Sequence, residues 1–215
     1  MPDVSSCTNC SRLSDFLSEL RQEHSDYYNL PVNAFGDDKA RLLIVGLAPG
    51  KHGANATGRP FTGDYAGVLL YQSLFKYGFA NKSESENIED GLELINCRIT
   101  NAVKCLPPQN KPLGTEINAC NHYLEQELAE MPDNSVIMAL GGIAHKAVLK
   151  ARNLKQSPYK FAHLAEHDIG SGLRLIDSYH CSRYNTQTKR LTTKMFENVF
   201  QQVVDRLAQS GQSPE

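Results

Sequence analysis

The stretch "RLLIVGLAPGKHGANATGRPFTGD" (41–64) decides the fold. Its first six residues are an apolar run rich in branched side chains, which predicts a strand buried on both faces of a parallel sheet. From Gly46 to Asp64 the stretch holds five glycines and two prolines in nineteen residues. A strand that runs into such a loop and then into a helix predicts a ligand site.

Two common nucleotide-binding loops do not fit this stretch. A P-loop needs four residues between its glycines and then Lys followed by Ser or Thr. Here three residues separate Gly46 from Gly50, and His52 follows Lys51. The dinucleotide pattern G-x-G-x-x-G is also absent from the stretch. The loop therefore predicts a ligand other than a nucleotide triphosphate.

The rest of the chain alternates strands with helices. Further strands are predicted at 98–104, 135–141 and 173–180, and helices at 11–23, 65–77, 115–130, 142–151 and 193–208. This alternation predicts a three-layer α/β/α sandwich with a central four-stranded parallel sheet. We expect a single domain over 1–209, a solvated excursion at 80–90 and a disordered tail at 210–215.

Composition describes an ordinary globular protein. The chain has 215 residues, of which 40% are hydrophobic and 21% charged, and its net charge is −2. This balance excludes a nonspecific polycation, although a local basic loop can still contact nucleic acid. The sequence has no run of eighteen apolar residues, and its N-terminus lacks the apolar core of a secretory signal. We therefore expect a cytoplasmic protein without a membrane span.

The cysteines form two groups. Cys7 and Cys10 are a C-x2-C pair, and fourteen residues separate Cys105 from Cys120. Four thiolates can hold zinc or an iron–sulfur cluster, and the spacing leaves both open. Small buried hydrophobic residues are the alternative for any of them. Cys97 and Cys181 are interpreted as non-ligands.

Four residues follow the predicted strands or the glycine-rich loop and suit a pocket that binds a base. The amide of Asn101 both donates and accepts, so it can match the edge of uracil, or it can stabilise a turn. Phe61 can stack on a flat ring or belong to the core. Asp64 can stabilise an oxocarbenium ion, act as a base, or cap the helix that follows. His180 can stabilise a developing anion or be structural.

The segment 182–194 is the densest basic stretch. Arg183, Lys189, Arg190 and Lys194 alternate with Ser, Thr and Gln side chains. Such a loop suits phosphate contacts, and a merely solvated loop is the alternative.

Three stretches together resemble a known family. "GLAPGKHGANATGRPFTGD", "ITNAVKCLPPQNKP" and "HCSRYNTQTKRLT" resemble the motif regions of the iron–sulfur branch of the uracil-DNA glycosylase superfamily, and type 5 within it. The resemblance covers residues 7–192. It implies a four-stranded parallel sheet between helices, a [4Fe–4S] cluster, and DNA repair by monofunctional excision of uracil, with hypoxanthine, xanthine and other deaminated bases as further candidates. It also implies a DNA partner; we expect a monomer whose abasic product passes to downstream enzymes.

The resemblance also implies roles for individual residues. The cluster ligands are Cys7, Cys10, Cys105 and Cys120. The catalytic residues are His180 and Asp64. The base is bound by Gly46, Leu47, Ala48, Phe61, Asn101, Ser182 and Asn185, and DNA phosphates by Arg183, Lys189 and Arg190. The glycines of the first motif let backbone approach a flipped nucleotide.

Three positions matter for the family comparison. Type-4 enzymes carry Glu after the first motif glycine. This chain has Leu47 there, which cannot polarise water. Type-5 enzymes also lack a water-polarising side chain at this position. The family usually has Pro where this chain has Cys181 and often has Gly where it has Lys189. Because of Leu47, the alternative function is a non-catalytic module that contains a metal or cluster and binds nucleic acid.

Overall fold

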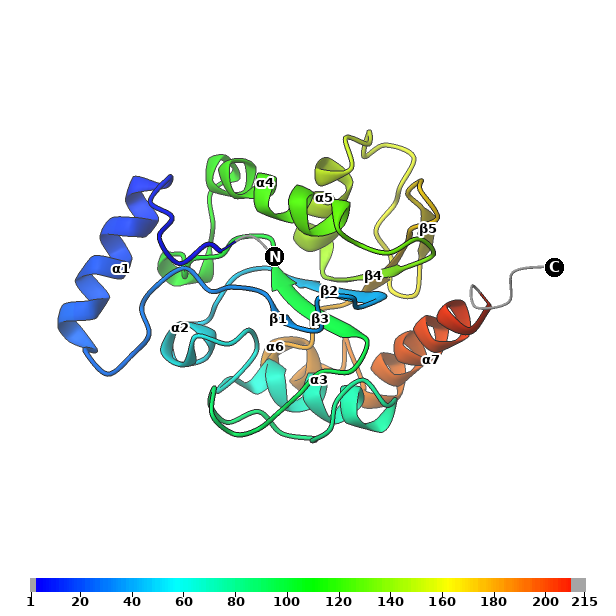
Figure 1. The fold of residues 1–215 in the computed structure, drawn as a ribbon, viewed down its shortest axis with the longest axis horizontal. Helices are drawn as coiled ribbons and strands as arrows, with labels where there is room; N and C mark the ends of the chain where they lie inside the picture. The colour runs from blue at the N-terminus through cyan, green and yellow to red at the C-terminus, as the bar shows by residue number, and fades with distance from the viewer. Residues whose placement is uncertain (1–2, 210–215) are drawn as a thin grey trace.

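A computed structural model describes residues 3–209 and shows one sheet covered by helices on both faces (Figure 1). The sheet has six strands in the order β1-β3-β2-β4-β6-β5. The strands are β1 Phe35–Gly36, β2 Leu42–Gly46, β3 Cys97–Asn101, β4 Val136–Leu140, β5 Glu166–Asp168 and β6 Arg174–Ser178.

The four central strands are parallel, as predicted. Leu42 of β2 lies opposite Cys97 of β3 on one side and Val136 of β4 on the other, and β4 pairs with β6 in the same direction. The predicted total of four strands is wrong, because β1 and β5 extend the sheet as antiparallel edges. These edge strands have only two and three residues, so no apolar run reveals them.

The helices that cover the sheet are those the sequence predicts. Side chains alternate along β2, so Leu42 and Ile44 join the core beneath α3 and α7, while Leu43 and Val45 join the core beneath α4 and α5. This arrangement confirms the three-layer sandwich. The helices are α1 Ser11–Glu23, α2 Ala54–Thr57, α3 Tyr65–Lys76, α4 Gly114–Ala129, α5 Gly142–Ala151, α6 Arg183–Gln187 and α7 Thr193–Gln209, with a 3-10 turn η1 at Pro108–Asn110.

Helix α1 lies at one end of the molecule, beside the loop that follows β3 (Figure 1). Leu13, Leu17 and Leu20 repeat at helical spacing and form one buried face. That face packs against Val103 and Leu106 of the loop. The packing holds the N-terminal cysteine pair next to Cys105.

Two sequence-based expectations remain, one about a membrane span and one about the C-terminal tail. Within residues 3–209, no helix has the length and apolar character needed to cross a membrane. The tail predicted at 210–215 lies outside the described residues.

Candidate functional site

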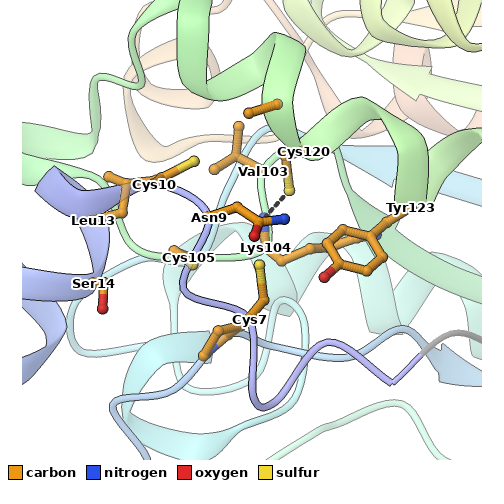
Figure 2. A pocket seen from close by; sticks show the side chains of 12 residues that line it. Cys7, Asn9, Cys10, Leu13, Ser14, Val103, Lys104, Cys105, Cys120 and Tyr123 are labelled. Atoms are coloured by element: carbon orange, nitrogen blue, oxygen red, sulfur yellow. Dashed lines mark hydrogen bonds between the residues drawn. The ribbon is translucent and has the colours of Figure 1, made fainter.

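The four predicted ligand cysteines line one pocket between α1, the loop after β3, and α4 (Figure 2). Cys7 and Cys10 come from the N-terminal segment, Cys105 from the loop and Cys120 from α4. None of them forms a disulfide. Four thiols that line one pocket are a donor set of the kind that holds zinc or an iron–sulfur cluster.

The environment of the cysteine pocket raises the pKa of its two buried thiols, so that without a bound cation they remain protonated. Burial and the neighbouring thiols Cys120, Cys7 and Cys10 raise the pKa of Cys105 to about 12. Burial also raises the pKa of Cys120 to about 11, although its sulfur accepts a hydrogen bond of 3.3 Å from the Lys104 N–H. A bound metal deprotonates such thiols outright, so the set fits a metal group.

A second cluster of ligand-type residues is internally satisfied. His145 Nδ1 lies 2.8 Å from Asp177 Oδ1, and His145 Nε2 lies 3.2 Å from the Tyr159 carbonyl oxygen. His167 Nε2 lies 3.3 Å from the other carboxylate oxygen of Asp177. These contacts describe a buried hydrogen-bond network that ties α5 to β5 and β6.

The second predicted site is a cavity of about 240 Å³ at the carboxyl ends of β2, β3 and β6. This is where parallel sheets place their ligands. Seven predicted site residues line it: Leu47, Ala48, Phe61, Asp64, Asn101, His180 and Ser182. Of the remaining lining residues, Pro49 and Gly50 belong to the first motif loop, whereas sequence reasoning missed Ala54, Ala66 and Asn110. Asn110 lies within one of the quoted motif stretches, so its position in that stretch was a usable signal.

Gly46 lies behind this cavity and does not line it. A Cβ built on Gly46 would lie 2.4 Å from Asn101 Oδ1 and 2.7 Å from Phe61 Cζ. Any side chain would displace both groups. The last residue of β2 must therefore be glycine for the Asn101 amide and the Phe61 ring to lie against the sheet.

The rings of Phe61 and His180 form two neighbouring walls of the cavity. Their ring centroids are 6.0 Å apart and their planes are inclined by 28°. Phe61 is 6% exposed and belongs to the core cluster, yet its ring also lines the cavity. The core and stacking alternatives are therefore compatible.

Two polar atoms of the cavity residues have no partner among residues 3–209. They are Asn101 Oδ1 and His180 Nδ1, and both are buried. Burial lowers the pKa of His180 to about 4, so its imidazole is neutral at pH 7. Buried polar atoms without partners are uncommon, so this pair indicates a ligand with matching polar groups.

Asp64 is a helix cap that also faces the cavity. Its Oδ1 accepts a 2.9 Å hydrogen bond from the Gly67 N–H at the start of α3. Burial raises the pKa of the carboxyl group, against the lowering effect of the backbone hydrogen bonds from Gly67 and Ala66. The cap role is confirmed, and the position in the cavity keeps the chemical role open.

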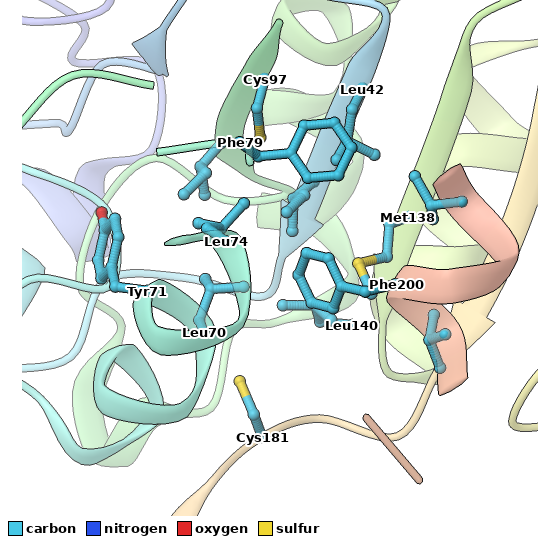
Figure 3. Packing of buried hydrophobic residues seen from close by; sticks show 14 of the residues in the cluster. Leu42, Leu70, Tyr71, Leu74, Phe79, Cys97, Met138, Leu140, Cys181 and Phe200 are labelled. Carbon is cyan, nitrogen blue, oxygen red and sulfur yellow. The ribbon is translucent and has the colours of Figure 1, made fainter. Parts of the chain in front are cut away.

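The loop after β6 is anchored by buried side chains at both ends. Cys181 and Leu191 are both 0% exposed and belong to the core between the sheet, α3 and α7. Figure 3 shows the Cys181 sulfur directed toward that core. Cys181 and Cys97 are both buried residues of this core.

Ser182 and Asn185 shape the same loop. The Ser182 side chain caps α6, and Asn185 Nδ2 donates a 2.8 Å hydrogen bond to the His180 carbonyl oxygen. Asn185 does not line the cavity, in contrast to its predicted role as a base contact. Its contact instead supports the backbone of His180.

The basic residues of this loop are exposed. The guanidinium of Arg183 lies 5.0 Å from the centroid of the Tyr65 ring, and that of Arg190 lies 5.0 Å from the centroid of Tyr179. Lys189 has φ +57°, in the left-handed region that favours glycine. This conformation explains in physical terms why the resembling family often has glycine there.

The protein is an α/β sandwich with a cavity at the carboxyl ends of its parallel strands, lined by amide, imidazole and carboxylate side chains and an aromatic ring. A sequence profile of the uracil DNA glycosylase superfamily matches residues 34–204. A type-5 uracil-DNA glycosylase of Thermus thermophilus is 43% identical over 201 residues, which cover 91% of each chain. Type-5 enzymes of Pyrobaculum aerophilum and Mycobacterium bovis are 39% and 38% identical, over 90% and 93% of this chain and 85% and 77% of theirs. The chain therefore belongs to the uracil-DNA glycosylase superfamily and, within it, to the type-5 family.

Proposed function

We propose that this protein is a monofunctional uracil-DNA glycosylase of base excision repair. It excises uracil from DNA by hydrolysing the N-glycosidic bond of a flipped nucleotide. The names of the relatives support this function. The observation that carries it is the cavity at the carboxyl ends of the strands, which is lined together by Asn101, Phe61, Asp64 and His180.

Base recognition rests on Asn101 and Phe61. A base inside a duplex cannot be reached, so it is flipped into the cavity. The Asn101 side chain then accepts from N3–H and donates to O4 of uracil, and it mismatches the amino group of cytosine. Phe61 stacks on the ring. Gly46 makes room for both.

The chemistry rests on His180 and Asp64. As the glycosidic bond breaks, negative charge develops on the base and positive charge on the sugar. His180 is neutral, so it stabilises the leaving base by donating a hydrogen bond to a carbonyl oxygen. The carboxylate of Asp64 stabilises the sugar cation or orients water. Water then bonds to C1′ through its oxygen and supplies the proton that N1 of the base takes up.

DNA binding extends from the cavity to the loop after β6. Arg183, Lys189 and Arg190 are exposed there and contact phosphates. Hypoxanthine and xanthine are further substrates to test. Three parts of the proposal rest on sequence reasoning alone: a cytoplasmic location, a monomeric state, and transfer of the abasic product to another enzyme.

The proposal includes a [4Fe–4S] cluster held by Cys7, Cys10, Cys105 and Cys120. The choice of a cluster rather than zinc rests on the resemblance to the iron–sulfur branch of the superfamily. The cluster would hold together the loops around it.

The cluster is tested by metal analysis. We expect brown purified protein with four iron atoms per chain, and we expect Cys105→Ala to lose iron and melt at a lower temperature. Cys97→Ala is a matched control, because Cys97 is a buried thiol far from the pocket that should leave iron content unchanged. One zinc per chain in colourless protein would refute the cluster but keep the four ligands.

Activity is tested with labelled duplexes that carry one uracil, hypoxanthine or xanthine. Incubation followed by alkaline treatment should give a nicked strand from the uracil duplex. A nick without alkaline treatment would contradict the monofunctional mechanism. Binding to the uracil duplex without any product would instead support the non-catalytic module.

A further inference from the structure

Phe61 adopts a backbone conformation that a bulky residue rarely takes. Its φ is +57°, in the left-handed region. Such a residue persists only where its surroundings determine it from several sides. The ring it carries forms one wall of the cavity, so whatever fixes this backbone also fixes that wall.

The backbone of the turn at residues 59–62, here called the Phe61 turn, is held on one side by α3. A Cβ on Gly67 would lie 1.8 Å from the Phe61 carbonyl oxygen, so the helix lies in direct contact with the turn. The Tyr71 hydroxyl donates a 2.7 Å hydrogen bond to the Pro60 carbonyl oxygen. Both contacts hold carbonyl groups that flank the strained residue.

The other side of the Phe61 turn is held through side chains. Arg59 is 4% exposed, and its Nη1 donates to both carboxylate oxygens of Asp90 at 2.9 Å and to Ser85 Oγ at 3.1 Å. Thr62, which is 0% exposed, shares a 2.6 Å hydrogen bond with the same Ser85 hydroxyl. The two end residues of the turn are therefore fixed to residues 85 and 90.

Asp90 is itself fixed by its own loop. Its carboxylate accepts hydrogen bonds from the backbone N–H groups of Glu86, Asn87 and Leu92 at 2.9, 3.3 and 2.9 Å. The segment 80–90, expected as a solvated excursion, is mostly exposed, but its Asp90 side chain is only 10% exposed and points inward. Ser85 and Asp90 of this segment thus fix the Phe61 turn from the side that faces away from the cavity.

We propose that Asp90 is a positioning residue for base excision, because its ion pair with Arg59 holds the Phe61 turn and thereby the ring that stacks on the flipped base. This inference rests on the proposed function, and it deepens the account of the same site. Neither Asp90 nor Ser85 touches the cavity. Their hydrogen bonds reach the cavity through Arg59 and Thr62, the two end residues of the Phe61 turn.

The test uses Asp90→Asn, which keeps the size of the side chain and one accepting oxygen, but removes its charge and replaces the other acceptor by an NH2 group. In single-turnover assays on uracil duplex, well below the melting temperature of each variant, we expect excision to slow by about 10–100-fold. The Kd for the duplex should stay within about threefold, because the phosphate contacts remain. In a Phe61→Ala background, Asp90→Asn should add little further loss.

Glu166→Gln is the matched control. It removes the charge of a carboxylate that pairs with Arg206 at 2.8 Å, at the far edge of the sheet, and its excision rate should not change. Equal rates for Asp90→Asn and wild type would overturn the inference. So would full additivity with Phe61→Ala, which is the result of a merely structural role.

A spectroscopic measurement tests the same link without catalysis. The protein is labelled with 4-fluorophenylalanine, and the Phe61 signal is assigned by its loss in Phe61→Leu. Asp90→Asn should shift or broaden this ¹⁹F signal, and Glu166→Gln should not. An unmoved signal would overturn the inference even if the enzyme slows. Wild-type protein without uracil excision would refute the proposed function, and the ¹⁹F result would still decide the link from Asp90 to Phe61.

Discussion

Replacing Gly46 with alanine should disable the cavity by adding one methyl group. The new Cβ would lie 2.4 Å from Asn101 Oδ1 and 2.7 Å from Phe61 Cζ, whereas ordinary contacts begin at 3.4 Å. To restore such contacts, the Asn101 oxygen must move by about 1.0 Å and the Phe61 ring by about 0.7 Å. Both groups that hold the base are thus displaced at once.

The size of the effect follows from these displacements. Misplacing a reacting group by about 1 Å can slow a reaction by about 10²-fold, which corresponds to about 2.7 kcal/mol of activation free energy. Over-packing at a buried position also lowers the free energy of unfolding by about 1–3 kcal/mol. We therefore expect a folded variant with a lower melting temperature and about 10²-fold slower excision.

The assay is single-turnover excision from uracil duplex with enzyme in excess, at a temperature where melting curves show the variant folded. Gly114→Ala is the control, since a Cβ at Gly114 has no atom within 4 Å and the residue begins α4. It should match wild type in rate. If Gly46→Ala excises uracil within about threefold of wild type, the argument that Asn101 and Phe61 act from these positions is wrong.

Three further predictions concern the cavity side chains. Asn101→Ala should slow uracil excision with a loss of about 1–3 kcal/mol in transition-state binding, while gel-shift affinity for undamaged DNA stays unchanged. Asp64→Asn keeps the N-cap of α3, so a rate loss of about 10²–10⁴-fold at an unchanged melting temperature would identify a chemical role. If Asp64→Asn has no effect and Asp64→Ala only lowers the melting temperature, Asp64 is a helix cap alone. His180→Ala should slow excision by a similar factor. Because burial lowers the pKa of His180 to about 4, the unfolded chain binds more protons at this residue between the ordinary value of 6.5 and 4, so stability falls as pH falls through that window. His180→Ala should therefore lose less melting temperature than wild type between pH 6.5 and 4; equal losses would contradict the buried, neutral imidazole.

The central fold could be predicted from the sequence because its strands are covered on both faces. Short apolar runs such as those in 41–46 and 135–141 bury side chains on both faces of a strand, which is typical of the middle of a parallel sheet. The edges could not be predicted in this way. β1 and β5 have few residues and only partly buried or exposed side chains, so backbone pairing alone defines them. Helix α6 is not predicted from the sequence, because its five residues, RYNTQ, bury no side chain and so show no apolar periodicity.

The candidate site was predictable where a residue type has a direct chemical use. Asn101, Phe61, Asp64 and His180 each carry a group that suits a base or a sugar cation, and all four line the cavity. Asn185 was assigned to the base, but its side chain supports the His180 backbone, because sequence cannot distinguish a contact with ligand from a contact with loop. Asp90 was missed for a related reason. Its partner Arg59 is thirty-one residues away, and no local pattern connects them.

The burial of Cys181 and Leu191 has a consequence for the order of events on DNA. The loop between them is fastened to the core at both ends, so it has little freedom to reshape itself around a duplex. On a proposed base-flipping enzyme, the work of deformation then falls on the nucleic acid. The DNA duplex must open, unstack and bend until a base reaches the cavity of the protein, which is already formed. Under the proposed function, a uracil in weakly paired or frayed DNA should therefore reach the cavity at the lowest free-energy cost.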